Sequence, residues 1–143
     1  MFNRGIVFFI FFIMVFIGNI FANDTISFAL EITGINVNQG QIYVRIYSNE
    51  RDYRNDIPYA TYVLESTSQS IVYPFDILEG EYVISLFQDT NNNGKSDTNF
   101  LGMPREPVGL SNHSRGIPGG FNKLKIPINN NSNRLTINLR QIK

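Results

Sequence analysis

Alternating apolar and polar positions predict a series of β-strands along the chain. In residues 25–33, TISFALEIT, large apolar side chains recur at every second position from Ile26 to Ile32, whereas Ser27 and Glu31 fall on the other face. Successive side chains of a strand point to opposite sides of a sheet, so this spacing indicates a half-buried strand. We therefore expect this strand to cover a core with its apolar face.

The same pattern recurs in residues 41–48, QIYVRIYS, where Ile42, Val44 and Ile46 would face inward. Tyrosine and arginine take the outward positions between them. A connection with two glycines joins this run to the preceding one, and such a connection between two strands favours a β-hairpin. We therefore expect the first two strands to pair with each other.

Five more segments have strand character, and two of them carry positional information. The segments are 59–67, 70–77, 79–88, 121–128 and 134–142. Pro74 lacks a backbone N–H and would interrupt a ladder, which places the second segment at a sheet edge or a bulge. The third segment is apolar on both faces, which favours a central strand. Residues 49–58 are charged and end in proline, so they predict an exposed connection with one helical turn at most.

Together these segments predict an all-β fold. About seven short strands, polar turns and no sustained 3.6-residue periodicity are typical of a single antiparallel β-sandwich or a barrel. The exception to short connections is the segment from Thr90 to Gly120, which has almost no strand pattern and is dense in Gly, Pro and Asn. Connections of this length inside compact domains are usually functional or disordered, so we expect a site here.

The N-terminal residues have the three parts of a secretory signal peptide. A short lead with Arg4 precedes the apolar run 6–17, and the small residue Ala22 suits cleavage after it. The run is shorter than the roughly 20 residues that span a bilayer, and a retained anchor is the alternative. We therefore expect a signal peptide at 1–22, one β-sandwich domain at 23–143, a periplasmic or secreted location and no membrane span after cleavage.

Composition excludes several classes of function. Without Arg4 the chain has 11 basic and 12 acidic residues, a net charge of −1, which gives no overall electrostatic attraction to nucleic acid or to an anionic membrane. The absence of cysteine excludes disulfides, thiol catalysis, iron–sulfur clusters and cysteine zinc sites, and the single histidine excludes a multi-histidine metal centre. We expect a monomer whose partner is an unidentified protein or a component of the cell envelope.

The stretch DTNNNGKSD, residues 89–97, opens the long segment and has the spacing of a calcium loop. Counted from its first aspartate, oxygen-bearing side chains fall at positions 3, 5 and 9, and glycine falls at position 6. This is the beginning of the EF-hand pattern D-x-[DN]-x-[DN]-G, in which a glycine that tolerates positive φ lets the chain reverse. The expected ligands are Asp89, Asn91, Asn93 and Asp97 through their side chains and Lys95 through its backbone carbonyl, with Gly94 as the structural turn.

The calcium motif is incomplete, because position 12 is Phe100 instead of a bidentate glutamate. A further ligand would come from closer binding by Asp97, from water, or from Asn99 or Glu106. Few carboxylates and the nearby Lys95 predict weak binding, with a Kd of about 10⁻⁴ to 10⁻³ M. The alternative is a metal-free turn, because Asn, Asp and Gly also build tight turns in which Asx side chains accept local backbone N–H groups.

A longer stretch resembles a known family. From Gly80 to Asn112 the chain contains G-x-Y, then D-x-N-x-N-G-x-x-D-x-N, then L-G-x-P-x-E and G-x-S-N. These motifs resemble the exported bacterial domain-of-unknown-function 2141 family, from which Gln88 and Val108 depart where the family often has a histidine and an aromatic residue. The resemblance implies a secreted or periplasmic β-sandwich, Ig-like or prealbumin-like, with no established reaction. Prealbumin-like and bacterial-surface modules place calcium loops between strands, so the resemblance adds to the calcium hypothesis.

Other side chains suggest an enzyme as the alternative. His113 lies beside Ser111 and Ser114, but no G-x-S-x-G elbow accompanies them. Glu106 and Asp97 would form a carboxylate pair for glycoside chemistry only at a suitable separation. We therefore expect no catalytic residue here.

Two tyrosines suggest a binding face. Tyr43 and Tyr47 lie on the outward side of one predicted strand, where they would bind a sugar or peptide or would simply pack across strands. We expect a non-enzymatic module in which calcium at 89–97 orders the segment as far as Gly120 into an interaction surface. The alternative is a small-ligand or carbohydrate-binding protein, or a hydrolase, that uses residues 90–120 as a lid.

Overall fold

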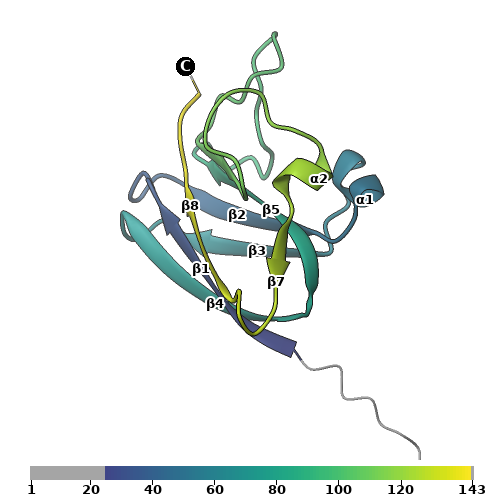
Figure 1. Ribbon diagram of the computed structural model, residues 1–143. Coiled ribbons are helices and arrows are strands. Elements are labelled where there is room, and N and C mark those ends of the chain that lie inside the picture. Colours follow the sequence, from purple (N-terminus) through teal and green to yellow (C-terminus); the bar gives the residue numbers. More distant parts are fainter. Residues whose placement is uncertain (1–24, 143) are drawn as a thin grey trace, which may run out of the picture.

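The chain folds into two β-sheets (Figure 1). The computed structural model describes residues 25–142, so the predicted signal peptide at 1–22 lies outside the described residues. The strands are β1 (Thr25–Thr33), β2 (Gln41–Tyr47), β3 (Ala60–Glu65), β4 (Ser70–Leu78), β5 (Gly80–Asp89), β6 (Val108–Leu110), β7 (Ile126–Ile128) and β8 (Arg134–Asn138). The helices are α1 (Glu50–Arg54) and α2 (Phe121–Leu124), and neither is long enough to cross a membrane. The prediction of a mostly β fold is confirmed.

The strands divide into one sheet of order β4-β1-β8 and one of order β3-β2-β5-β6, in which β7 also pairs with β5. β1 and β8 run parallel, whereas the sequence predicted antiparallel pairs throughout. A parallel pair needs a long crossover, and here nearly the whole described chain separates the two strands. The described residues contain eight strands against about seven expected, because β6 has three residues and is too short for its alternation to be recognised.

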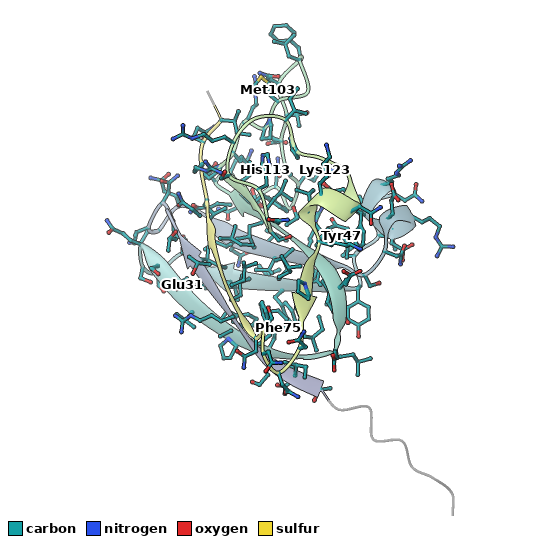
Figure 2. All side chains as sticks on the ribbon, viewed as in Figure 1. Glu31, Tyr47, Phe75, Met103, His113 and Lys123 are labelled. Carbon is teal, nitrogen blue, oxygen red and sulfur yellow. The ribbon has the colours of Figure 1, made fainter. Side chains whose placement is uncertain are left out.

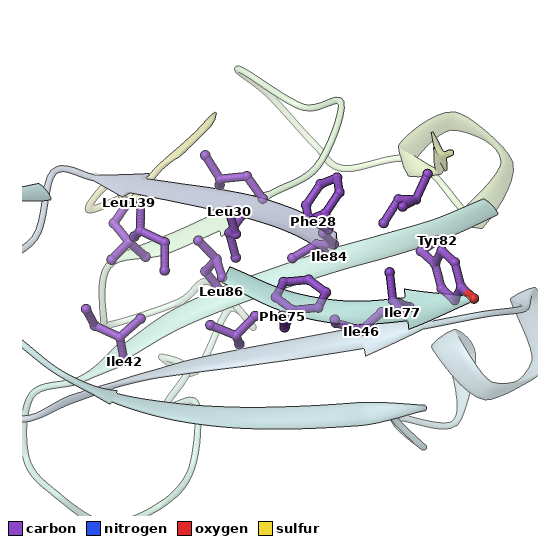
Figure 3. Packing of buried hydrophobic residues seen from close by; sticks show 14 of the residues in the cluster. Phe28, Leu30, Ile42, Ile46, Phe75, Ile77, Tyr82, Ile84, Leu86 and Leu139 are labelled. Atoms are coloured by element: carbon purple, nitrogen blue, oxygen red, sulfur yellow. The ribbon is translucent and has the colours of Figure 1, made fainter. Parts of the chain in front are cut away.

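One apolar cluster lies between the two sheets (Figure 3). The side chains predicted to face inward from β1 and β2 are at most 4% exposed, so the alternation is confirmed as a guide to the buried face. The labelled members come from both sheets and include Phe28, Leu30, Ile42, Ile46, Phe75, Ile84 and Leu86. Burying one such side chain contributes about 1.5–3 kcal/mol, which makes this cluster the main source of stability.

A second apolar cluster lies on the other face of β5, beneath α2. It consists of Tyr47, Val83, Phe121 and Leu124, with Tyr53 of α1 packed against it. Tyr47 lies on the predicted outward face, away from the first cluster, but it is buried there at 3% exposure. The prediction of residues 121–128 as one strand is wrong, because α2 occupies its first half. Phe121 and Leu124 are three residues apart and share one face of a helical turn, which covers the tyrosine.

The predicted hairpin between the first two strands is also wrong, because β1 and β2 belong to different sheets. Alternation identifies which face of a strand is buried and does not identify its neighbour. The connection between them is held by other segments: the Ile35 N–H donates to the Gln69 carbonyl oxygen at 3.3 Å and the Asn38 N–H donates to the Ser66 carbonyl oxygen at 2.7 Å. β1 and β2 therefore face each other across the core.

Three positional predictions are confirmed. β4, which contains Pro74, is an edge strand. β5 is central, between β2 and β6. The charged connection contains only the short helix α1, whose N-cap Asn49 accepts the Asp52 N–H through its side-chain oxygen at 2.9 Å.

From the environment of the Tyr47 hydroxyl we expect the folded protein to lose stability at alkaline pH. Burial, and then the hydrogen bond that its hydroxyl donates to Asp56, raise the pKa of Tyr47 in the folded protein. Because the pKa of Tyr47 is higher in the folded protein than the value of about 10 in the unfolded chain, the folded state is stabilised at any pH below about 10. Above about pH 10 this contribution to the free energy of unfolding falls by up to about 1.4 kcal/mol per pH unit. Urea unfolding at increasing pH should show this decline, and Tyr47→Phe should make it shallower. The same slope in both proteins would contradict the assignment.

Candidate functional site

The candidate loop begins where β5 ends, beside the connection between β1 and β2. Gln88 is fully buried: its Nε2 donates to the carbonyl oxygens of Asn36 and Gln39 at 2.6 and 2.7 Å, and its Oε1 accepts the Asn36 N–H at 2.9 Å. Gly40 approaches Asp89 so closely that a Cβ atom would lie 1.7 Å from the Asp89 carbonyl oxygen. The start of the loop is therefore fixed against the connection that joins the two sheets.

Asp89 closes the turn from its buried side. The residue is 1% exposed, and its Oδ1 accepts the Asn93 N–H at 3.1 Å while its Oδ2 accepts the Gly94 N–H at 2.7 Å. Gly94 has a φ of +74°, a conformation that glycine adopts without steric strain. The chain thus reverses around this carboxylate.

Three side chains of the turn meet at one carboxylate oxygen. The Nδ2 atoms of Asn91 and Asn93 donate to Asp97 Oδ2 at 2.7 and 2.8 Å. The Oδ1 atoms of the same asparagines accept the N–H groups of Asn93 and Lys95 at 3.1 and 2.8 Å. These are Asx turns, in which an Asn side chain binds the backbone two residues further on. The structure therefore brings together Asn91, Asn93 and Asp97 beside the turn that Asp89 closes.

Glu106 folds back onto this turn from the far part of the long segment. The residue is 3% exposed, and its two oxygens accept the N–H groups of Thr90 at 2.9 Å and Asp97 at 3.2 Å. Hydrogen bonds to an ionised group are the stronger ones in proteins. Glu106 therefore ties the two ends of the turn together, and this arrangement does not favour the carboxylate-pair chemistry considered for it.

The oxygen-bearing side chains of the turn are of the kind that binds calcium, if the amides of Asn91 and Asn93 rotate. Carboxylate and amide oxygens are ligands that calcium prefers. The amide nitrogens of Asn91 and Asn93 now face Asp97, so each amide would have to rotate to offer its oxygen to an ion. Within the described residues no group of three or more His, Cys, Asp or Glu side chains is arranged to hold a metal, so a site here would depend on amide and backbone oxygens.

The turn also satisfies its hydrogen bonds without an ion. In the part of the chain that the structure describes, every buried side-chain nitrogen and oxygen has a hydrogen-bond partner. Both interpretations of the motif, calcium loop and Asx-rich turn, are therefore compatible with the hydrogen bonds.

Asn99 does not join this cluster. Its Oδ1 accepts the N–H groups of Leu101 and Met103 at 2.9 and 3.0 Å, and its own N–H donates to the Met103 carbonyl oxygen at 2.8 Å. Residues 97–105 form a narrow projection closed by these bonds, which we call the finger. Asn99 thus orders the finger and lies outside the group of candidate ligands.

The serine and histidine considered for catalysis make separate contacts. Ser111 is fully buried, and its Oγ donates to the Leu124 carbonyl oxygen at 2.7 Å and accepts the Ile84 N–H at 3.0 Å. His113 lies on the loop above the sheets, with its Nε2 3.3 Å from the Gly116 carbonyl oxygen (Figure 2). Ser111 therefore links β5 to α2, a role that sequence reasoning missed because a serine in a Gly- and Pro-rich segment carries no burial signal.

The two tyrosines considered for a sugar-binding face do not share an exposed surface. The ring of Tyr43 stacks on Phe87, with centroids 4.7 Å apart and planes 8° apart, and the Arg45 guanidinium lies 5.0 Å from the centroid of the same Phe87 ring. Tyr47 is buried as a member of the second apolar cluster. Cross-strand packing accounts for Tyr43, whereas Tyr47 packs against Tyr53 of α1 and Phe121 of α2.

The chain matches the model of a bacterial protein family. The family is described as an uncharacterized protein conserved in bacteria (DUF2141), and the match covers residues 30–136. This range includes strands of both sheets and the whole segment between β5 and β6. No curated protein and no solved structure matches the chain. The resemblance found in the sequence motifs is confirmed.

Proposed function

Since the chain belongs to DUF2141, a family of uncharacterized proteins conserved in bacteria, we propose a function from its own residues. It is an exported, non-enzymatic β-sandwich module, Ig-like or prealbumin-like, that binds calcium weakly at residues 89–97. The bound ion orders the segment as far as Gly120 into an interaction surface. The signal-like residues 1–22 support export, and the oxygen-rich turn supports the ion.

The observation that carries the proposal is the convergence of Asn91 and Asn93 on Asp97 Oδ2, at 2.7 and 2.8 Å. Side chains that already meet at one point need only local rotations to surround an ion. Turning both amides would replace their two N–H···O bonds to Asp97 by two oxygen–calcium contacts. It would also release the Asn93 and Lys95 N–H groups, which now donate to the oxygens of the same amides. Asp89 and Asp97 would supply the negative charge, and the Lys95 carbonyl would supply a further oxygen.

Ordering of the segment follows from the position of Glu106. Its carboxylate spans the turn by holding the Thr90 and Asp97 N–H groups. An ion bound to Asp97 would restrain the same residue from its other side. Restraint at this point would reduce the motion of both the finger and the chain that leads to β6.

We expect calcium to raise the melting temperature of the protein. A ligand at 100 times its Kd stabilises the folded state by about 2.7 kcal/mol. This corresponds to a shift of several degrees, to roughly 10 °C, in a domain of this size. The measurement is a melting curve in EDTA and in calcium at about 10 mM, which is 100 times the lower limit of the expected Kd.

The matched control is Asp97→Asn, which keeps the shape of the side chain and removes its charge. It should melt near the wild type in EDTA and lose most of the calcium-dependent rise. Magnesium at the same concentration should have a smaller effect, because it demands a near-ideal octahedral geometry. Equal midpoints of the wild type in EDTA and calcium would contradict the proposal.

A further inference from the structure

The end of the finger is apolar and exposed to solvent. Phe100, Leu101 and Met103 are 95%, 69% and 38% exposed, and we call these three residues the apolar tip. Figure 2 shows Met103 near the outer end of the segment between β5 and β6, away from both sheets. Neighbouring exposed apolar side chains mark sites of interaction more often than single ones do.

Folding does not explain the apolar character of the tip. None of its three side chains belongs to either apolar cluster of the described residues. Polar groups close the finger instead: besides the bonds of Asn99 described above, the Gly102 N–H donates to the Asn99 carbonyl oxygen at 2.9 Å. At the base, the Arg105 N–H donates to the Asp97 carbonyl oxygen at 2.8 Å. The hydrogen bonds of the finger therefore hold an apolar surface in contact with solvent.

The exposed charged side chains of the segment that carries the tip are basic. In residues 90–120 they are Lys95, Arg105 and Arg115. Of the acids in the same segment, Glu106 is buried and Asp97 is half-buried, with its carboxylate bonded to two amides. The ion pairs found within the described residues include none of the three cations. The three cations are balanced in number by Asp89, Asp97 and Glu106, but the cations are the exposed charges of this end of the molecule.

We propose that the apolar tip inserts into the headgroup boundary of an anionic lipid bilayer, with Lys95, Arg105 and Arg115 against the lipid phosphates. Apolar side chains beside Lys and Arg are typical of segments that lie in a membrane interface, and anionic lipids attract such cations. A projecting tip suits a fluid surface, whereas a protein partner would have to supply a matching cavity. The insertion needs no calcium, because the hydrogen bonds of the finger hold the tip.

The test uses a tryptophan at the tip of the full chain. The chain has no tryptophan, so Phe100→Trp creates a single emitter at this position. With vesicles of phosphatidylglycerol and phosphatidylcholine in EDTA, its emission should shift to the blue and should be quenched by brominated lipids. EDTA excludes calcium bridging and separates this test from the calcium proposal. Because the signal comes from residue 100 alone, attachment through residues 1–22 does not by itself produce it.

Val72→Trp is the matched control, because Val72 is 52% exposed on β4, in the other sheet. Its emission should not change. In the Phe100→Trp background, Leu101→Ser should lower the vesicle partition coefficient about tenfold through lost apolar burial. Arg105→Gln should lower it about fivefold, as expected for one cation near an anionic surface. An unchanged emission of Phe100→Trp at saturating lipid, or an equal shift in the control, would overturn the proposal and favour a protein cavity as the partner of the tip.

Discussion

Replacing Glu106 with alanine is expected to destabilise the protein by about 3 kcal/mol, because two charge-assisted hydrogen bonds are lost at a buried position. The carboxylate accepts the Thr90 and Asp97 N–H groups and is 3% exposed, so water cannot readily replace it. The loss should lower the urea midpoint without changing the dependence of stability on urea. It should be as large in EDTA as in calcium, since these bonds are present without an ion.

Glu106→Gln separates this structural role from a catalytic one. Glutamine keeps one acceptor oxygen and turns an NH₂ group toward the other donor, so we expect about half of the loss caused by alanine. A catalytic Glu106 would instead lose turnover with little change in stability. Ordinary surface substitutions change the free energy of unfolding by about 0.5 kcal/mol at most. If both variants stay within this range of the wild type, Glu106 does not hold the two ends of the turn together.

Asp89→Ala is expected to cost about 3 kcal/mol in EDTA and to abolish the stabilisation by calcium. The buried carboxylate accepts the Asn93 and Gly94 N–H groups, and bonds to an ionised acceptor contribute about 1.5–3 kcal/mol each. Some of the cost is recovered because the freed N–H groups lie in an exposed part of the loop, where water reaches them. Melting curves of the variant in EDTA and in calcium should therefore coincide at a lowered midpoint.

Asp76→Ala is the matched control for this change, because it removes an exposed aspartate from β4. It should stay within about 0.5 kcal/mol of the wild type and should keep the full response to calcium. A calcium-dependent rise that survives in Asp89→Ala would remove this residue from the site.

The sequence predicts the buried faces of strands well and their neighbours poorly. Side chains such as Phe28 and Ile46 follow the period of two, which reflects local geometry and is readable from one segment. The neighbour of β1 is decided by the whole fold, so the predicted hairpin and the antiparallel order of β8 are wrong. The prediction of residues 121–128 as one strand is wrong for the same reason. Packing of Phe121 against the cluster that contains Tyr47 favours a helical turn there, and this packing depends on the whole fold.

The candidate site likewise has residues whose role the sequence predicts and residues whose role it does not. The spacing of Asp89, Asn91, Asn93 and Asp97 locates a turn whose side chains the structure brings together, because these contacts are local. Gln88 and Ser111 bind backbone groups of other segments, and only the tertiary fold assigns those partners. A polar residue that serves as an internal link has no signature in its own neighbourhood of the sequence.

Calcium titration of nitrogen-15-labelled protein, followed by NMR, tests the central proposal most directly. If the turn holds an ion, the side-chain NH₂ signals of Asn91 and Asn93 and the backbone signal of Gly94 should move together along one saturating curve. The curve should give a Kd of about 10⁻⁴ to 10⁻³ M. Signals that remain in place up to about 10 mM calcium, ten times the upper limit of that range, would show that residues 89–97 are a turn and not a calcium site.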